Sequence, residues 1–154
     1  MGFDDNGDDV YVMIAWDYIY YVRVKDGVQV NLGMTNRAGN GHVSCKAIRR
    51  PGWCYFSSRD QNQRLYAAKI GVPANATPIT DDRGNRVLPG LAVVEVWGFH
   101  KATYHNYATN AKVSVSPSGT KLVYSSDWWQ NLNQHAPHPG GGGEAHEYVL
   151  ELVQ

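Results

Sequence analysis

The segment that most constrains the fold runs from Val113 to Trp128, where a Pro-Ser-Gly turn separates two short apolar stretches. Pro117 presets the backbone for a turn, and Gly119 tolerates the positive φ that many tight turns require. On both sides of the turn, apolar residues alternate with small or polar ones, a pattern typical of strands that bury one face. The segment therefore predicts a β-hairpin.

The same layout of strands and turns recurs twice upstream. Strands are predicted at residues 9–15, 18–25 and 28–32, then at 42–48, 53–58, 64–70 and 93–97, and finally at 112–116, 121–125 and 146–152. We therefore predict an all-β chain that forms one segment over residues 1–154. Its three units cover about residues 1–35, 36–103 and 104–154, and the outer two are incomplete.

The last hairpin resembles the TolB-type β-propeller repeat, in which S-P-D-G-(K/T) precedes an apolar strand that ends in S-D. Here the turn stands as Ser116-Pro117-Ser118-Gly119-Thr120, and Ser126-Asp127 ends the strand that follows. Ser118 replaces the usual Asp. The resemblance implies a β-propeller-type fold built from about three four-stranded blade units. It extends to oligogalacturonate lyases and other polysaccharide lyases of this type.

Three units are fewer than the roughly four to eight blades that close a propeller. Two interpretations follow: the chain is a segment of a longer propeller, or several copies assemble to cover the open edges. We favour the first interpretation on the strength of the resemblance. The expected partners are therefore the remaining blades of a longer propeller or further copies of this chain.

Composition and charge exclude two classes of partner. The chain has 14 Lys and Arg against 14 Asp and Glu, so its formal net charge is zero and no overall field attracts nucleic acid. No apolar run is long enough to span a bilayer, so no membrane partner is expected. The acidic stretch from Met1 to Asp9 lacks the apolar core of a secretion signal, although a periplasmic or extracellular location is favoured.

Residues that can take part in catalysis or ligand binding, among them five of the six His, gather in the loops that this strand order places on one rim of the propeller. His42 and His105 each precede or open a strand expected next to the central channel, and imidazole acts as a general base near neutral pH. Tyr104 and Arg59 suit proton transfer or the neutralisation of a sugar carboxylate. We predict that His42, His105 and Arg59 are catalytic if they converge on one pocket. The alternatives are a backbone contact for His42 and a solvated loop position for His105.

The long loop after Asp127 suits sugar binding. Trp128 and Trp129 offer aromatic faces for the apolar side of a pyranose, while the amides and His135 that follow suit its hydroxyl groups. We predict that substrate is bound by Tyr104, Asp127, Trp128, Trp129 and His135. The alternative for Trp128 is a plug between blades.

No cofactor and no metal are expected. The similar lyases carry a His-Pro-His ligand set immediately before the last hairpin, whereas this chain has Asn110-Ala111-Lys112 there. His135 and His138 form only a pair, without the third ligand that a metal site needs. The expected function is recognition of an oligo- or polysaccharide, with lyase action on uronic-acid sugars as one version. A non-catalytic propeller that serves as a protein-interaction or structural scaffold is the other.

Two further features remain open to alternatives. Cys45 and Cys54 lie on the two arms of one predicted hairpin, where they form either a cross-strand disulfide or two buried thiols. The insertion at residues 71–90 contains a predicted small hairpin around Asp82-Arg83-Gly84-Asn85. We expect this insertion to contact another blade or another chain.

Overall fold

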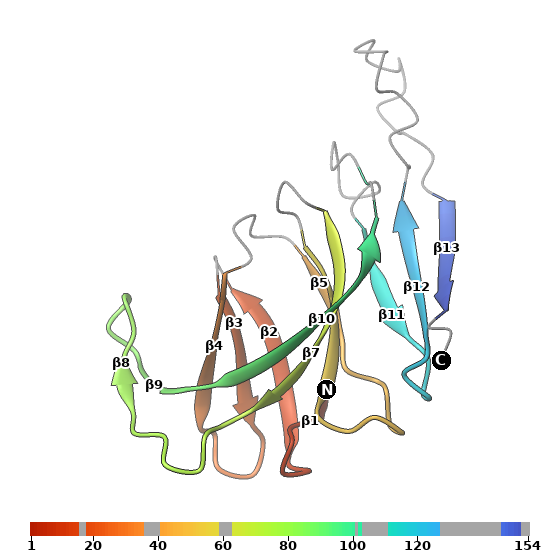
Figure 1. Ribbon diagram of the computed structural model, residues 1–154. Helices are drawn as coiled ribbons and strands as arrows, with labels where there is room; N and C mark the ends of the chain where they lie inside the picture. Colours follow the sequence, from red (N-terminus) through yellow and green to blue (C-terminus); the bar gives the residue numbers. More distant parts are fainter. Residues whose placement is uncertain are drawn as a thin grey trace.

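A computed structural model describes residues 1–15, 18–35, 41–58, 63–100, 102, 111–126 and 146–151. Within these ranges the chain forms strands and no helix. The strands make three sheets that lie next to one another, and none of the three closes into a barrel (Figure 1). The all-β prediction is confirmed.

The first sheet has six strands. In spatial order they are β1 (Gly2–Phe3), β2 (Asp9–Ala15), β3 (Tyr18–Arg23), β4 (Gln29–Thr35), β9 (Arg86–Pro89) and β8 (Ile79–Thr80). We predicted three strands for this part of the chain, and β1 adds a fourth because Gly2 and Phe3 pair with Val10 and Asp9. Gly27, with φ of +70°, lies in the predicted turn between β3 and β4.

The second and third sheets follow the predicted strand order. The second sheet consists, in spatial order, of β10 (Leu91–Phe99), β7 (Arg64–Gly71), β6 (Trp53–Ser57) and β5 (His42–Ser44). The third consists of β11 (Val113–Val115), β12 (Lys121–Ser126) and β13 (His146–Glu151). Strand β5 is shorter than the predicted 42–48, because the chain turns after Cys45 and Arg50 N–H donates to the Ala47 carbonyl over 2.9 Å.

The two inner strands of the second sheet, β6 and β7, are mostly buried on both faces, which explains the apolar runs from Cys54 to Phe56 and from Leu65 to Ala68. Cys54 and Phe56 face the first sheet, whereas Tyr55, between them, faces the third sheet. Successive side chains of a strand point to opposite faces, so the two hydrophobic cores of the molecule use alternate residues of the same strands. Strand β7 divides in the same way, with Leu65 in one core and Tyr66 in the other.

A hairpin from the second unit covers the edge of the first sheet. Strands β8 and β9 form the hairpin predicted around residues 82–85, and β9 pairs in parallel with β4, with Val30 opposite Leu88. The Tyr18 hydroxyl donates to Asp82 over 2.9 Å, and Gly90 N–H donates to the Asn31 carbonyl over 2.6 Å. The insertion at residues 71–90 therefore contacts the first sheet.

Cys45 and Cys54 form a disulfide, with their Cα atoms 4.2 Å apart. In the pairing of β5 with β6, Ser44 lies opposite Tyr55, so the next pair along the two arms is Cys45 and Cys54. Both cysteines are buried in the core between the first and second sheets. Of the two alternatives drawn from the sequence, the structure selects the cross-strand disulfide.

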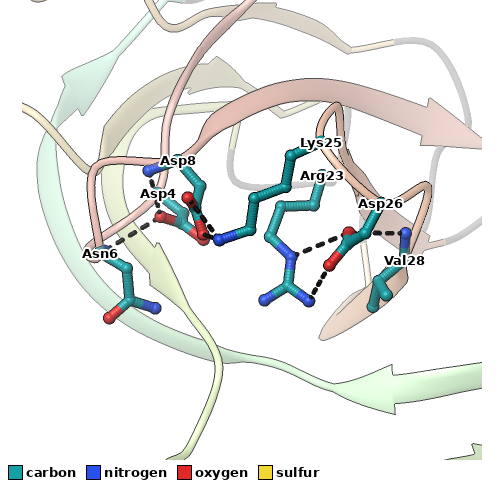
Figure 2. A network of polar contacts seen from close by, with 7 residues as sticks. All are labelled: Asp4, Asn6, Asp8, Arg23, Lys25, Asp26 and Val28. Carbon is teal, nitrogen blue, oxygen red and sulfur yellow. Dashed lines mark hydrogen bonds and ion pairs between the residues drawn. The ribbon is translucent and has the colours of Figure 1, made fainter.

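The loop before β2 is fixed by its own carboxylates. Asp4 is fully buried, and its Oδ1 accepts hydrogen bonds from the backbone N–H groups of Asn6 and Asp8, each over 3.0 Å (Figure 2). The Lys25 Nζ lies 2.7 Å from the Asp8 carboxylate and so links this loop to the turn after β3. That turn is closed by contacts among Arg23, Asp26 and Val28.

Candidate functional site

The antiparallel order of the strands brings several strand ends together at one end of the molecule. Here β6 and β10 end, while β5, β7 and β11 begin. Of the residues that we predicted to form a site, His42 lies among the described residues. The others lie outside them: Arg59, Tyr104, His105, Asp127, Trp128, Trp129 and His135.

Ser57 fixes the backbone of His42. The two residues lie opposite each other in β5 and β6, and His42 N–H donates to Ser57 Oγ over 3.1 Å. The same hydroxyl donates to the Ala111 carbonyl over 2.6 Å, and both Ser57 and Ala111 are fully buried. One serine therefore joins the start of β5 to the segment that leads into β11.

Ser44 provides a second link between the same two strands. Its Oγ accepts a hydrogen bond from Val115 N–H over 3.2 Å, and β5 lies beside β11 along this stretch. The two strands belong to different sheets, so Ser44 and Ser57 together hold the second and third sheets in register around His42. The position of His42 therefore depends on two sheets at once.

The environment of His42 favours the neutral form of its imidazole. Partial burial lowers the pKa of His42, and the nearby Lys112 ammonium lowers it further. Lys112 itself is exposed, but its backbone is fixed: its N–H donates to Ser125 Oγ over 2.9 Å, and its carbonyl accepts from Ser125 N–H over 3.1 Å. An imidazole whose pKa is lowered in this way is suited to removing a proton, and a nearby cation is suited to holding a carboxylate next to that proton.

His100 is a buried structural histidine that sequence analysis placed only within a loop. Its side chain is fully buried, and its Nδ1 accepts from Ala102 N–H over 3.1 Å. Because Nδ1 accepts, the ring proton is assigned to Nε2, which lies 2.7 Å from the Ser58 carbonyl and donates to it. Both ring nitrogens are thereby engaged, so His100 is not placed to act as a base.

Gln63 joins the two loops that meet at His100. Its carbonyl accepts from His100 N–H over 2.9 Å, and its Nε2 donates to the Ala102 carbonyl over 2.9 Å. Gln63 has a φ of +49°, a strained conformation for a residue other than Gly. Strain of this kind is stored where the surroundings hold the backbone firmly. The sequence carries no local signal for it, because the partners are backbone groups far along the chain.

The described residues bring no group of three or more His, Cys, Asp or Glu side chains into an arrangement that could hold a metal ion. An open cleft of about 600 Å³ lies at the other end of the first sheet, beside the turn after β3 and the hairpin of β8 and β9. It is lined by polar side chains such as Gln29 and Arg86 and by apolar ones such as Val28 and Leu88, and lies away from His42. It therefore adds nothing to the site around His42.

Comparison of the chain with models of known protein families, with curated proteins and with solved structures gave no match. Among the described residues there is no helix that could cross a membrane. The class that the fold and the described site define is thus a chain of three adjacent sheets, mostly antiparallel, with a half-buried histidine at one shared end.

Proposed function

We propose that this chain recognises an acidic oligo- or polysaccharide at the end of the sheets where His42 lies, and that it acts on uronic-acid sugars as a lyase. The observation that carries the proposal is that His42 is half-buried, has its backbone fixed by Ser57, and has a pKa lowered by burial and by the Lys112 ammonium. Trp128 and Trp129, which we predicted to bind sugar, lie in the sequence between β12 and β13. Strand β12 ends at the same end of the molecule as β6.

The proposed architecture is a β-propeller segment. Each of the three sheets begins with a short strand, β1, β5 or β11, and continues through at least two antiparallel neighbouring strands; in the first sheet this antiparallel series ends at β4, which pairs in parallel with β9. The short strands β5 and β11 lie side by side, as the innermost strands of adjacent blades do. These features support a blade-like arrangement in which the loops at one end share a ligand.

The proposed reaction is a β-elimination that needs both groups. The Lys112 ammonium pairs with the uronate carboxylate and makes the adjacent C5 proton more acidic. His42 takes that proton, the electron pair forms the C4–C5 double bond, and the oxygen at C4 leaves with the departing sugar, which takes up a proton. Arg59, Tyr104 and His105 are the candidates to protonate the leaving oxygen or to share the carboxylate charge. Their roles rest on their places in the sequence.

The test measures binding and turnover on the same samples. Calorimetry against a panel of uronic-acid polymers reports binding, and the ultraviolet absorbance of the unsaturated product reports elimination. His42→Ala is expected to abolish turnover while leaving affinity within about threefold, because a general base acts in the transition state rather than in ground-state binding. Trp128→Ala is expected to weaken binding by about 1–2 kcal/mol through loss of a stacked anchor.

Lys112 offers a matched pair of variants. Lys112→Ala is expected to lower both affinity and turnover, whereas Lys112→Arg keeps the positive charge and retains most of the affinity. If the parent protein binds a polymer without turnover, the result supports carbohydrate recognition and contradicts the lyase step. Neither signal with any polymer would contradict the proposal.

The second candidate function is that of a non-catalytic propeller used as a protein-interaction scaffold. The exposed apolar side chains of β10 favour it: Val93, Val94, Val96 and Phe99 are each about half exposed or more. Such side chains on an open strand suit contact with another protein. Absence of any saccharide signal, together with association of the protein in solution, would favour this function.

A further inference from the structure

Strand β10 is the outer edge of the second sheet. It pairs with β7 from Leu91 to Phe99, and within the part of the chain that the structure describes no strand pairs with its other side. The backbone N–H and C=O groups on that side form a template that a further strand could use. At nine residues, β10 is also the longest strand of the described chain.

The start of β10 lies beside β4, because Gly90 N–H donates to the Asn31 carbonyl over 2.6 Å. The stretch that follows, Val93 to Val96, lacks the features that usually protect an edge. Natural edge strands are short, kinked by a bulge, or carry charges and proline that prevent pairing. The bulge of β10 lies between Val96 and Gly98, beyond this stretch. Val93 and Val94 are 61% and 47% exposed. Glu95, the single charged residue of β10, is held by Arg50 Nη2 at 2.7 and 2.8 Å.

The outer edge of the third sheet differs in this respect. Strand β13 carries Glu147 and Glu151 on either side of the exposed Val149, all three on the same face. A copy of β13 that paired with it around Val149 would place Glu147 opposite Glu151 in both halves, and like charges directly opposite destabilise a pair of strands. The two open edges are therefore not equivalent, because β13 opposes a second copy in the register centred on its exposed valine, whereas β10 has a register centred on an exposed valine in which no like charges meet.

We propose that two copies of this chain associate through β10, which pairs antiparallel with β10 of the other copy around a two-fold axis. An antiparallel two-fold pair needs one residue to lie opposite its own equivalent, because opposing side chains share a face. Centring on Glu95 opposes two carboxylates, and centring on Val96 places the bulge inside the pair. Centring on Val94 avoids both, and sets Val93 of one copy opposite Glu95 of the other.

The charge of the whole chain agrees with association of identical copies. The formal net charge is zero, so no overall repulsion keeps two copies apart. A two-fold pair uses the β10 edge of both copies, so the assembly closes at two copies and leaves β13 on the outside. The result is one continuous antiparallel sheet that contains the second sheet of each copy.

The test is the mass of the full chain in solution by light scattering and sedimentation equilibrium at micromolar concentrations. The parent protein is expected to have twice the chain mass, and Val94→Lys is expected to reduce it to 17.1 kDa, because two ammonium groups would then face each other at the axis. Val149→Lys, at the 66% exposed position on β13, is the matched control and should keep the double mass. Circular dichroism and thermal unfolding check that both variants fold.

Cysteine cross-linking provides an independent measurement of the register. Val94→Cys is expected to form a covalent dimer under mild oxidation, whereas Val149→Cys should remain largely unlinked under the same conditions. A monomeric parent protein at high micromolar concentration would overturn the proposal. So would a Val94→Lys variant that stays dimeric, or a Val149→Lys variant that dissociates.

Discussion

Arg50 and Glu95 form a two-contact ion pair that ties a turn to an edge strand. The Nη2 atom of Arg50 lies 2.7 Å from Oε1 and 2.8 Å from Oε2 of Glu95. The guanidinium carbon of Arg50 lies 3.6 Å above the centre of the Trp53 ring, and its Nη1 donates to the Tyr55 hydroxyl over 3.3 Å. One cation thus connects the turn before β6, the strand β6 itself and the edge strand β10.

Arg50→Ala is expected to lower the free energy of unfolding by about 1–2 kcal/mol, the combined scale of a partly exposed ion pair and a cation–π contact. Arg49→Ala is the matched control, because the neighbouring Arg49 is exposed and its structural contact is made by its backbone N–H to the Pro117 carbonyl. Urea unfolding followed by Trp fluorescence measures both. Equal losses in the two variants would show that the guanidinium contacts of Arg50 contribute nothing specific.

Substitution of two glycines by Ala distinguishes the stability cost of a left-handed backbone from the cost of a steric contact. Gly119 has a φ of +77°, and a Cβ there would lie 2.8 Å from Tyr55 Oη. Gly27 has a φ of +70° with open space around it. Gly27→Ala should therefore cost only the left-handed backbone, about 1 kcal/mol. Gly119→Ala should cost at least about 1 kcal/mol more, because the added Cβ also disturbs the buried Tyr55 hydroxyl, which donates to the Gly119 carbonyl over 2.8 Å.

Chemical denaturation of these two variants under identical conditions is the measurement. The difference between them isolates the contact between the third sheet and Tyr55, since both share the conformational term. If Gly119→Ala proved no more destabilising than Gly27→Ala, the contact between the Gly119 turn and Tyr55 would carry no weight in stability.

The disulfide between Cys45 and Cys54 is expected to contribute about 2–3 kcal/mol to stability, the value for closing a loop of roughly ten residues in the unfolded chain. Replacing both cysteines with Ala should remove this contribution. Reductant should then shift the unfolding midpoint of the parent protein but not that of the double variant. Intact mass before and after reduction and alkylation gives the fraction of oxidised protein, and a parent protein that is fully alkylated without reduction would contradict the pairing.

The strand order was predictable because its signals are local. Alternating apolar residues and the glycine turns at Gly27, Gly52, Gly84 and Gly119 mark where strands end, and each of these glycines has a positive φ in the structure. What local patterns do not encode is pairing between distant segments. Strand β1 has two residues and is visible only through its partner β2, and β9 joins β4 in parallel across a long stretch of chain.

The candidate site was predictable only in part, for the same reason. His42 was identified because it opens a strand, and its place at the start of β5 is confirmed. The serines that hold it, Ser44 and Ser57, act through backbone groups of a different sheet, which no spacing rule reveals. His100 has no distinguishing neighbours in the sequence, because the groups that satisfy its ring are the Ser58 carbonyl and the Ala102 N–H.

The pH dependence of stability gives a direct test of the environment of His42. Burial and Lys112 lower its pKa, so below the ordinary histidine pKa of about 6.5 the unfolded chain binds a proton that the folded chain does not. Stability should therefore fall as the pH drops below about 6.5, and this part of the loss should be absent in His42→Gln, which cannot take up the proton.

Lys112→Ala provides the matched variant for the electrostatic cause. It removes the second of the two effects on His42 and leaves the burial, so the pKa of His42 should rise toward the ordinary value without reaching it. Proton NMR titration of the His42 ring, assigned by comparison with His42→Gln, measures the shift, while Lys121→Ala serves as a control for removing a cation paired elsewhere, with Glu151. An unchanged His42 titration in Lys112→Ala would show that Lys112 does not act on His42. It would also contradict the proposed elimination, which needs the base and the cation close together.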